Sequence, residues 1–302
     1  MEVDSQLEWR SVAIGLTMIP VEFEYHRPAS LEEATRLLSA FGEDAKLLSG
    51  GQSLVPLMKL RLARPKHVID LGALPGLDYI RDEGDRIAIG ALVTHTEIEE
   101  SDLLKRKCAL LPQAATTIAD VQVRNRGTIG GSLAHADPTA DLPPALLALD
   151  GEIKVLGRGG ERWIKAADFF LTIFTTAIEP DEIVTEIRVP AREEHKSAYL
   201  KAAQRASGFA VVGVAACLKL GRDARCEDIA IGLTGVTDKP YRARDVEDRL
   251  RGQRLESKLI EEAAARVVDG VDVNEDINGS REYRSHLARV YTARAIEGAL
   301  KT

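Results

Sequence analysis

The sequence predicts an α+β protein built from two parts, and three features of the chain lead to this fold class. Two glycine-rich loops, at residues 49–61 and 125–144, stand among short strand and helix patterns in the first part. A polar stretch, residues 191–196, separates the first part from the second. In the second part, strand patterns are followed by helix patterns, which is typical of an antiparallel sheet covered on one face by helices.

Apolar periodicity and capping or turn residues place the elements of the first part. A capping box at Ser30 precedes apolar residues at helical spacing, and Pro112 separates two further helical stretches. Asp141, followed by two prolines, marks the start of another helix, and the glycine-rich turn at 157–160 predicts a β-hairpin. The predicted helices are 30–42, 97–105, 113–119 and 141–150, and the predicted strands are 45–49, 67–71, 86–91, 152–156, 161–164 and 183–189.

The second part is predicted to form a three-stranded antiparallel sheet with helices. The expected strands are 198–205, 210–220 and 228–236, and the expected helices are 242–251, 256–268 and 280–300. We expect the last helix to present one apolar side, formed by Leu287, Val290, Tyr291 and Ala295.

Domain boundaries follow from these patterns. The folded pattern begins at Met18, so residues 1–17 are expected to be an N-terminal extension. The first domain is expected to span 18–192 and the second 197–302.

Composition excludes several classes of protein. The formal net charge of −7 argues against general nucleic-acid binding, which needs a basic face. No apolar run is long enough to span a bilayer. The three cysteines form no C-x-x-C pair and the six histidines show no metal-ligand spacing, so we expect no metal or iron–sulfur site on this chain. This cysteine usage favours a reduced, cytoplasmic location.

The glycine loops are the strongest chemical signal in the sequence. Each loop carries a Gly-Gly pair beside small hydroxyl residues, so backbone N–H groups can approach an anion closely. Two such loops on one ligand would suit a molecule with two phosphates, such as a dinucleotide. The Rossmann and P-loop glycine patterns are both missing, as are H-E-x-x-H and G-x-S-x-G. No residue stands out as a catalytic nucleophile, and we predict no catalytic residue.

Read as complete motifs, the loops indicate a family. SGGQSLVPLMKLR at 49–61 and RGTIGGSLAHADPTADLPP at 126–144 are joined by YLKAAQRASGFAVVGVAACL and EYRSHLARVYTARAI in the second part. With the opening Met18-Ile19-Pro20, these segments resemble the FAD-binding (medium) subunit of the molybdenum hydroxylases, of the carbon monoxide dehydrogenase and xanthine dehydrogenase type. The resemblance covers 18–302. It implies a p-cresol methylhydroxylase-type FAD domain with α/β subdomains at about 18–75 and 76–192, then a flavoprotein C-terminal domain.

The resemblance also implies which residues contact FAD. In the first loop, backbone N–H groups are expected to hold the pyrophosphate, and the second loop is expected to close on the cofactor from the other side. The family often has His where Gln52 stands and Asn where Ser132 stands. The implied residues are Leu47, Leu48, Ser49, Gly50, Gly51, Gln52, Ser53 and Leu54 in the first loop, Thr128, Ile129, Gly130, Gly131 and Ser132 in the second, and Ile118, Asp141, Val184 and Lys201 elsewhere.

Two of these positions carry charge. Asp141 would be repelled by a pyrophosphate, so we expect it to accept from cofactor hydroxyls; a plain helix N-cap is the equal alternative. Lys201 matches a lysine that contacts the cofactor, and a cation there would stabilise a reduced, anionic flavin. Its alternative is a solvated strand lysine. For Ile118 and Val184, ordinary core packing is the alternative.

By resemblance, the chain is an FAD-binding electron-transfer subunit of a molybdenum-dependent hydroxylase. A small partner subunit would carry 2Fe–2S clusters and a large one the molybdenum cofactor, assembled as a dimer of heterotrimers. Electrons would pass from the clusters through FAD to an external acceptor. The substrate site would lie on another chain. The alternatives are a free-standing FAD-dependent oxidoreductase of the same fold and an assembly subunit that has lost FAD.

Overall fold

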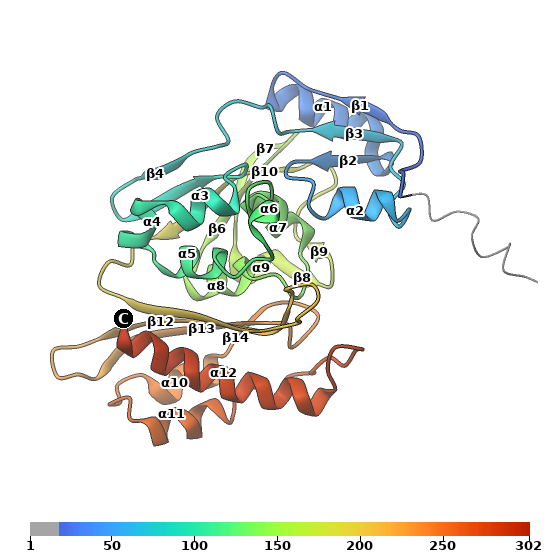
Figure 1. Ribbon diagram of the computed structural model, residues 1–302. Helices are drawn as coiled ribbons and strands as arrows, with labels where there is room; N and C mark the ends of the chain where they lie inside the picture. Colours follow the sequence, from blue (N-terminus) through green and yellow to red (C-terminus); the bar gives the residue numbers. More distant parts are fainter. Residues whose placement is uncertain (1–17) are drawn as a thin grey trace, which may run out of the picture.

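The computed structural model describes residues 18–302, so the predicted extension at 1–17 lies outside the described residues. The described chain is arranged as three stacked units (Figure 1). A small N-terminal unit lies at one end, a larger α/β unit lies in the middle, and the C-terminal sheet with its helices lies at the other end.

The N-terminal unit is built on a parallel sheet with strand order β1-β3-β2. Its strands are β1 (Glu24–His26), β2 (Ala45–Leu48) and β3 (His67–Asp70), and its helices are α1 (Leu31–Phe41), the short 3₁₀ helix η1 (Gly42–Asp44) and α2 (Leu54–Lys59). Ser30 caps α1 by accepting from the N–H of Glu33, but the Glu33 carboxylate accepts from the N–H of Ala29, so only half of the predicted capping box is present. Apolar side chains of α1 and β3 form a separate small core, which includes Ala34, Leu38 and Ile69.

The middle unit is a five-stranded antiparallel sheet, order β4-β5-β10-β6-β7. Its strands are β4 (Ile80–Asp82), β5 (Arg86–Gly90), β6 (Glu152–Gly157), β7 (Gly160–Lys165) and β10 (Ile183–Pro190), with a small hairpin of β8 (Phe170–Thr172) and β9 (Thr175–Thr176). Its helices are α3 (His95–Glu100), α4 (Asp102–Lys107), α5 (Leu110–Ala115), α6 (Val121–Arg124), α7 (Ile129–His135), α8 (Leu142–Ala148) and α9 (Ala166–Phe169). The predicted hairpin around 157–160 is present as β6–β7.

Two helix predictions in this unit were wrong. The single helix expected at 97–105 is two helices, because Ser101 leaves helical geometry and its hydroxyl accepts from the N–H of Leu104 to cap α4. The helix expected at 113–119 begins earlier, as α5, and contains Pro112. Pro112 is tolerated because it lies in the first helical turn, where an N–H has no intrahelical acceptor.

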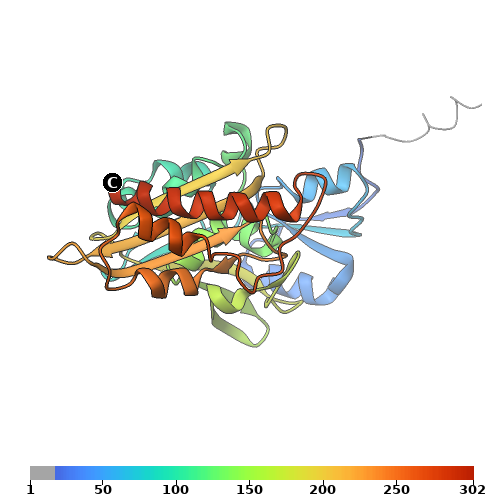
Figure 2. The same ribbon diagram turned by 90° about the horizontal axis from the view of Figure 1, so that it is seen from below.

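The C-terminal unit has a four-stranded sheet, where the sequence predicted three strands. Its strands are β11 (Lys196–Ala203), β12 (Ala210–Leu220), β13 (Cys226–Thr234) and β14 (Tyr241–Arg242), and its helices are α10 (Arg244–Leu250), α11 (Ser257–Ala264) and α12 (Arg281–Lys301). Figure 2 shows α12 lying lengthwise along the sheet. The sheet is covered on both faces, since α5 and α8 of the middle unit pack on the face opposite α12.

The buried side of α12 also differs from the prediction. Ala295 is buried as predicted, whereas Leu287, Val290 and Tyr291 are only partly buried, and the other buried positions include Arg284, Ala288, Thr292 and Ala299. Within residues 18–302, no helix is both long enough and apolar enough to cross a bilayer.

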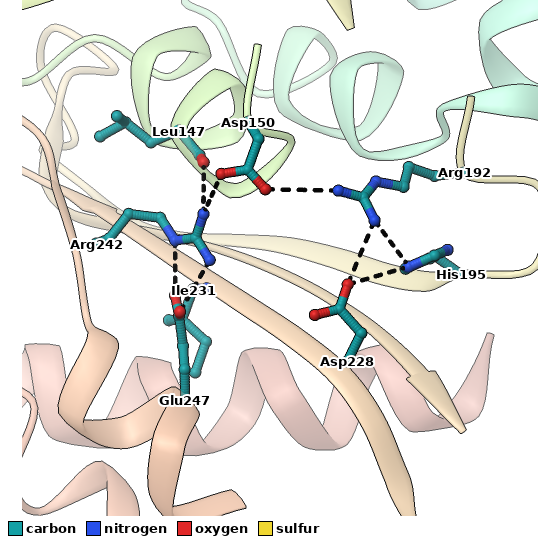
Figure 3. A network of polar contacts seen from close by, with 8 residues as sticks. All are labelled: Leu147, Asp150, Arg192, His195, Asp228, Ile231, Arg242 and Glu247. Atoms are coloured by element: carbon teal, nitrogen blue, oxygen red, sulfur yellow. Dashed lines mark hydrogen bonds and ion pairs between the residues drawn. The ribbon is translucent and has the colours of Figure 1, made fainter. Parts of the chain in front are cut away.

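A polar network joins the middle and C-terminal units (Figure 3). Arg242 of β14 donates to the carbonyl of Leu147 at 3.2 Å and to Asp150 at 2.6 Å, and it pairs with the buried Glu247 at 2.7 Å. Asp150 also pairs with Arg192 at 3.5 Å. The network therefore connects the end of α8 to the far edge of the C-terminal sheet.

Candidate functional site

The two glycine loops lie in direct contact with each other. A Cβ added to Gly50 would lie 2.0 Å from the carbonyl oxygen of Arg126, so only glycine lets the first loop pack on the second. The hydroxyls of Ser49 and Thr128 lie 3.1 Å apart and bridge the loops. Gly131 faces both hydroxyls, because a Cβ there would lie 2.8 and 2.9 Å from them. Segments 79 residues apart therefore form one surface.

The first loop presents unpaired backbone donors. Strand β2 ends at Leu48 and α2 begins at Leu54, and Gly51 between them has a φ of +74°. Within residues 18–302, the N–H groups of residues 50–53 donate to no protein acceptor. Successive free N–H groups around a glycine with positive φ form a concave site for an anion.

The second loop uses its donors internally. Thr128 caps α7 by accepting from the N–H of Gly131 at 3.2 Å, and the N–H groups of Ile129 and Gly130 donate to the carbonyls of Val93 and Ala91. Gly130 is required here, because its Cβ would lie 2.7 Å from Ala91. Ser132 donates to the carbonyl of Thr128. The second loop thus forms a wall beside the free N–H groups of the first loop, with its own N–H groups at residues 129–132 already hydrogen-bonded.

The predicted charged residues Asp141 and Lys201 form a buried ion pair. Lys201 Nζ donates to Asp141 Oδ2 at 2.9 Å and to the carbonyl of Thr117 at 2.6 Å, and the two side chains are 5% and 7% exposed. Burial raises the pKa of Asp141, and the Lys201 ammonium and the Tyr199 hydroxyl partly offset this effect. Lys201 is therefore not a solvated strand lysine. Asp141 precedes α8, yet its side chain makes no capping hydrogen bond.

Sequence reasoning missed Tyr199. Its hydroxyl donates to Asp141 Oδ1 at 2.6 Å, and burial followed by the Asp141 charge raises the pKa of this phenol well above its usual value. Tyr199 and Lys201 are two residues apart on β11, so both side chains point to the same face and reach the same carboxylate. The two-residue spacing of Tyr199 and Lys201 on a predicted strand was the sequence signal that could have indicated Tyr199.

Several of the remaining predicted residues pack in apolar cores or are exposed. Ile118 and Val184 pack with the main apolar core of the middle unit, and Leu47 packs against the core of the N-terminal unit. Gln52 is exposed, and its side-chain amide donates to the carbonyl of Gly50 at 3.4 Å.

Comparison with known proteins identifies the family. Residues 21–192 match the FAD binding domain in molybdopterin dehydrogenase, and residues 197–299 match the CO dehydrogenase flavoprotein C-terminal domain. The chain belongs to the FAD-binding medium subunits of the molybdenum hydroxylases. It is therefore an oxidoreductase subunit whose cofactor is FAD.

Relatives of this medium subunit match nearly along their full length. The glyceraldehyde dehydrogenase medium chain of Sulfolobus acidocaldarius is 39% identical, over 93% of this chain and 99% of the relative. The carbon monoxide dehydrogenase of Hydrogenophaga pseudoflava, solved in a form lacking the Mo-pyranopterin moiety, has a chain that superimposes with a TM-score of 0.90. That chain is 38% identical, with 94% of this chain and 99% of that chain covered. Quinoline 2-oxidoreductase from Pseudomonas putida 86 gives a TM-score of 0.88 at 32% identity, covering 93% and 98%.

The residues present fit FAD. The free N–H groups of residues 50–53 suit a pyrophosphate, and the space that a Cβ on Gly131 would fill lies beside two hydroxyls. The first loop of this medium subunit therefore offers donors that could hold a diphosphate.

Proposed function

We propose that this medium subunit holds FAD at the paired loops and transfers electrons between an iron–sulfur partner and an external acceptor. The observation that carries the proposal is the run of free N–H groups at residues 50–53 beside the wall formed by the second loop. When bound, FAD supplies a centre that takes up single electrons and releases one or two. The chain's own task is then to bind, orient and tune this group.

Each part of the site has a separate task in this proposal. The N–H groups of residues 50–53 neutralise the diphosphate, and the Ser49 and Thr128 hydroxyls add donors. Lys201 supplies a positive charge that favours a reduced, anionic cofactor. Asp141 and Tyr199 act as positioning residues, since they hold Lys201 at a fixed place on β11.

The partners follow from the family. Relatives are named as medium chains and as a dehydrogenase complex subunit, which supports a complex with a small and a large subunit. In our proposal the small subunit carries the 2Fe–2S clusters, the large subunit carries the molybdenum cofactor, and two heterotrimers pair in the cytoplasm. The substrate reacts on the large subunit, in keeping with the sequence-based expectation of no catalytic residue in this chain.

The first test is an absorption spectrum of the purified chain, with FAD added back and dithionite as reductant. We expect flavin bands near one equivalent that bleach on reduction. Gly50→Ala should abolish binding, because its Cβ would lie 2.0 Å from the Arg126 carbonyl. Gly159→Ala is the matched control, since its Cβ meets nothing within 4 Å. Gly131→Val, at the second loop, should also lose FAD binding.

Two results would overturn the proposal. One is a co-purified complex that contains the chain but no flavin, which would favour an assembly subunit that has lost FAD. The other is substrate turnover by the isolated chain, which would favour a free-standing flavoenzyme.

A further inference from the structure

Three side chains with metal-ligating atoms meet on the outer edge of the N-terminal sheet. Glu24 and His26 lie on β1, and His67 lies on the neighbouring parallel strand β3. The strand register places Glu24 opposite His67, and residues two apart on β1 point to the same face. His26 and His67 are 41 residues apart, which is why spacing along the sequence did not show the cluster.

The three ligating atoms lie at separations close to those of a coordination sphere. His26 Nε2 lies 3.1 Å from His67 Nδ1, and Glu24 Oε2 lies 3.3 Å from His67 Nδ1 and 3.8 Å from His26 Nε2. Atoms bound to Zn²⁺ at about 2.0–2.2 Å in a tetrahedron are about 3.3–3.6 Å apart. The observed separations of 3.1, 3.3 and 3.8 Å lie on either side of this range, so small side-chain movements would bring the three atoms onto one face of a zinc tetrahedron.

The two imidazole rings are held in place before any ion binds. The His67 ring stacks on Phe41, the last residue of α1, with centroids 3.7 Å apart and planes 8° apart. The His26 ring lies 5.0 Å from the same Phe41 ring. Their side chains are 22% and 17% exposed for His26 and His67, whereas the Glu24 side chain is 72% exposed. The carboxylate can therefore close on the rings from the solvent side.

We propose that Glu24, His26 and His67 bind one divalent transition-metal ion, with Zn²⁺ as the preferred occupant and water as its fourth ligand. Two imidazoles and a carboxylate form a donor set that suits zinc. The ion would link β1 to β3. Among the strands of residues 18–302, β1 is a three-residue edge strand that pairs with β3 alone. The ligand His67 pairs in register with Ala45, the first residue of β2, whereas the first loop follows Leu48, the last residue of β2, so the ion would have a structural role.

The test is a Zn²⁺ titration of the untagged, chelator-treated full chain against a chromogenic competitor. We expect one equivalent of tightly bound Zn²⁺ and a higher melting temperature with the ion present. Glu24→Gln and His26→Gln should each weaken Zn²⁺ binding by at least the 10- to 100-fold that loss of an outer-shell partner costs. His286→Gln, which removes an exposed histidine on α12, is the matched control and should bind Zn²⁺ as the wild type does.

Co²⁺ gives a second readout, because four-coordinate Co²⁺ absorbs visible light far more strongly than the hydrated ion. We expect such a band at wavelengths beyond the flavin bands, absent in His26→Gln. Equal Zn²⁺ affinity in wild type and both variants, or no binding by the wild type at micromolar Zn²⁺, would refute the site. Flavin content should be unchanged in every variant, which keeps this test separate from that of the FAD site.

Discussion

His95 shows how a single buried residue under the second loop makes stability depend on pH. It is 5% exposed, its backbone N–H donates to Gly127, and a Cβ on Gly127 would lie 2.8 Å from its ring. Burial, with a smaller contribution from the Arg124 charge, lowers the pKa of His95 from 6.5 to about 4. Between these pH values the unfolded chain takes up a proton that the folded chain does not, so stability falls as the pH falls.

We therefore expect His95→Gln to flatten the pH dependence of stability. A shift of this size corresponds to about 3 kcal/mol lost by the wild type between pH 7 and pH 4. Urea unfolding at pH 7 and pH 4 would measure it, with the exposed His286→Gln as control. If His95→Gln lost as much stability as the wild type over this range, the buried neutral imidazole would not be the cause.

The Asp141–Lys201 pair allows charge and hydrogen bonding to be separated. Asp141→Asn leaves the Lys201 ammonium buried without its carboxylate, which we expect to cost about 3–5 kcal/mol of unfolding free energy. Tyr199→Phe keeps the ion pair and removes one hydrogen bond to a charged group, for about 1.5–3 kcal/mol. Urea unfolding of both variants would check that Asp141→Asn loses more unfolding free energy than Tyr199→Phe. Equal losses would contradict this order and would mean that the phenol hydrogen bond contributes as much as the opposite charge.

At the scale of elements, the N-cap of α7 connects helix stability to the cofactor site. Thr128→Ala should cost about 1 kcal/mol of stability through the lost cap, as should Ser101→Ala at α4. Of these two capping residues, Thr128 is the one that contacts the first loop, through Ser49. We expect Thr128→Ala to weaken FAD binding about tenfold, or about 1.4 kcal/mol, and Ser101→Ala to leave it unchanged. Fluorescence titration with FAD would measure the affinity of both variants. Equal affinities would show that the N-cap of α7 does not contribute to FAD binding.

Elements with a clear local pattern could be predicted from the sequence, whereas those set by tertiary contacts could not. The β6–β7 hairpin follows from its turn glycines, and β12 was predicted with its observed ends, 210–220. Strand β14 has only two residues and thus no periodicity to read. The buried face of α12 was predicted only in part, at Ala295, because Arg284 also lies on it and donates to the carbonyls of Val211 and Gly235. A pattern of apolar residues cannot reveal a buried arginine.

The candidate site, too, could be predicted from the sequence only in part. Both glycine loops were recognisable as motifs from their Gly-Gly pairs, although of these four glycines only Gly51 has a positive φ. The direct contact of Gly50 with Arg126 was not predictable from either motif alone. Asp141 and Lys201 were singled out separately, but their pairing joins residues 60 apart on different units of the fold. Such a pairing depends on how α8 packs against the C-terminal sheet.

At the scale of the whole molecule, charged contacts fix the C-terminal unit, which carries Lys201, to the middle unit. Asp150 pairs with both Arg192 and Arg242, and Asp228 of β13 pairs with Arg192 at 3.3 Å and with His195 at 3.4 Å (Figure 3). Burial, followed by the Arg192 charge, lowers the pKa of His195. The two units therefore meet through a connected network as well as through the apolar packing of α5 and α8.

The Arg242–Glu247 pair is the most buried part of this network and provides its sharpest test. Glu247 is 1% exposed and also accepts from the N–H of Ile231 at 2.8 Å. Arg242→Met should destabilise the protein by about 3–5 kcal/mol, because it leaves the Glu247 carboxylate buried without a cation. Adding Glu247→Gln should recover most of that loss, since the amide oxygen is neutral and can still accept from Ile231. A double-mutant cycle by urea unfolding measures the coupling, and a double variant as unstable as Arg242→Met would show that lost packing, not unpaired charge, is the cause.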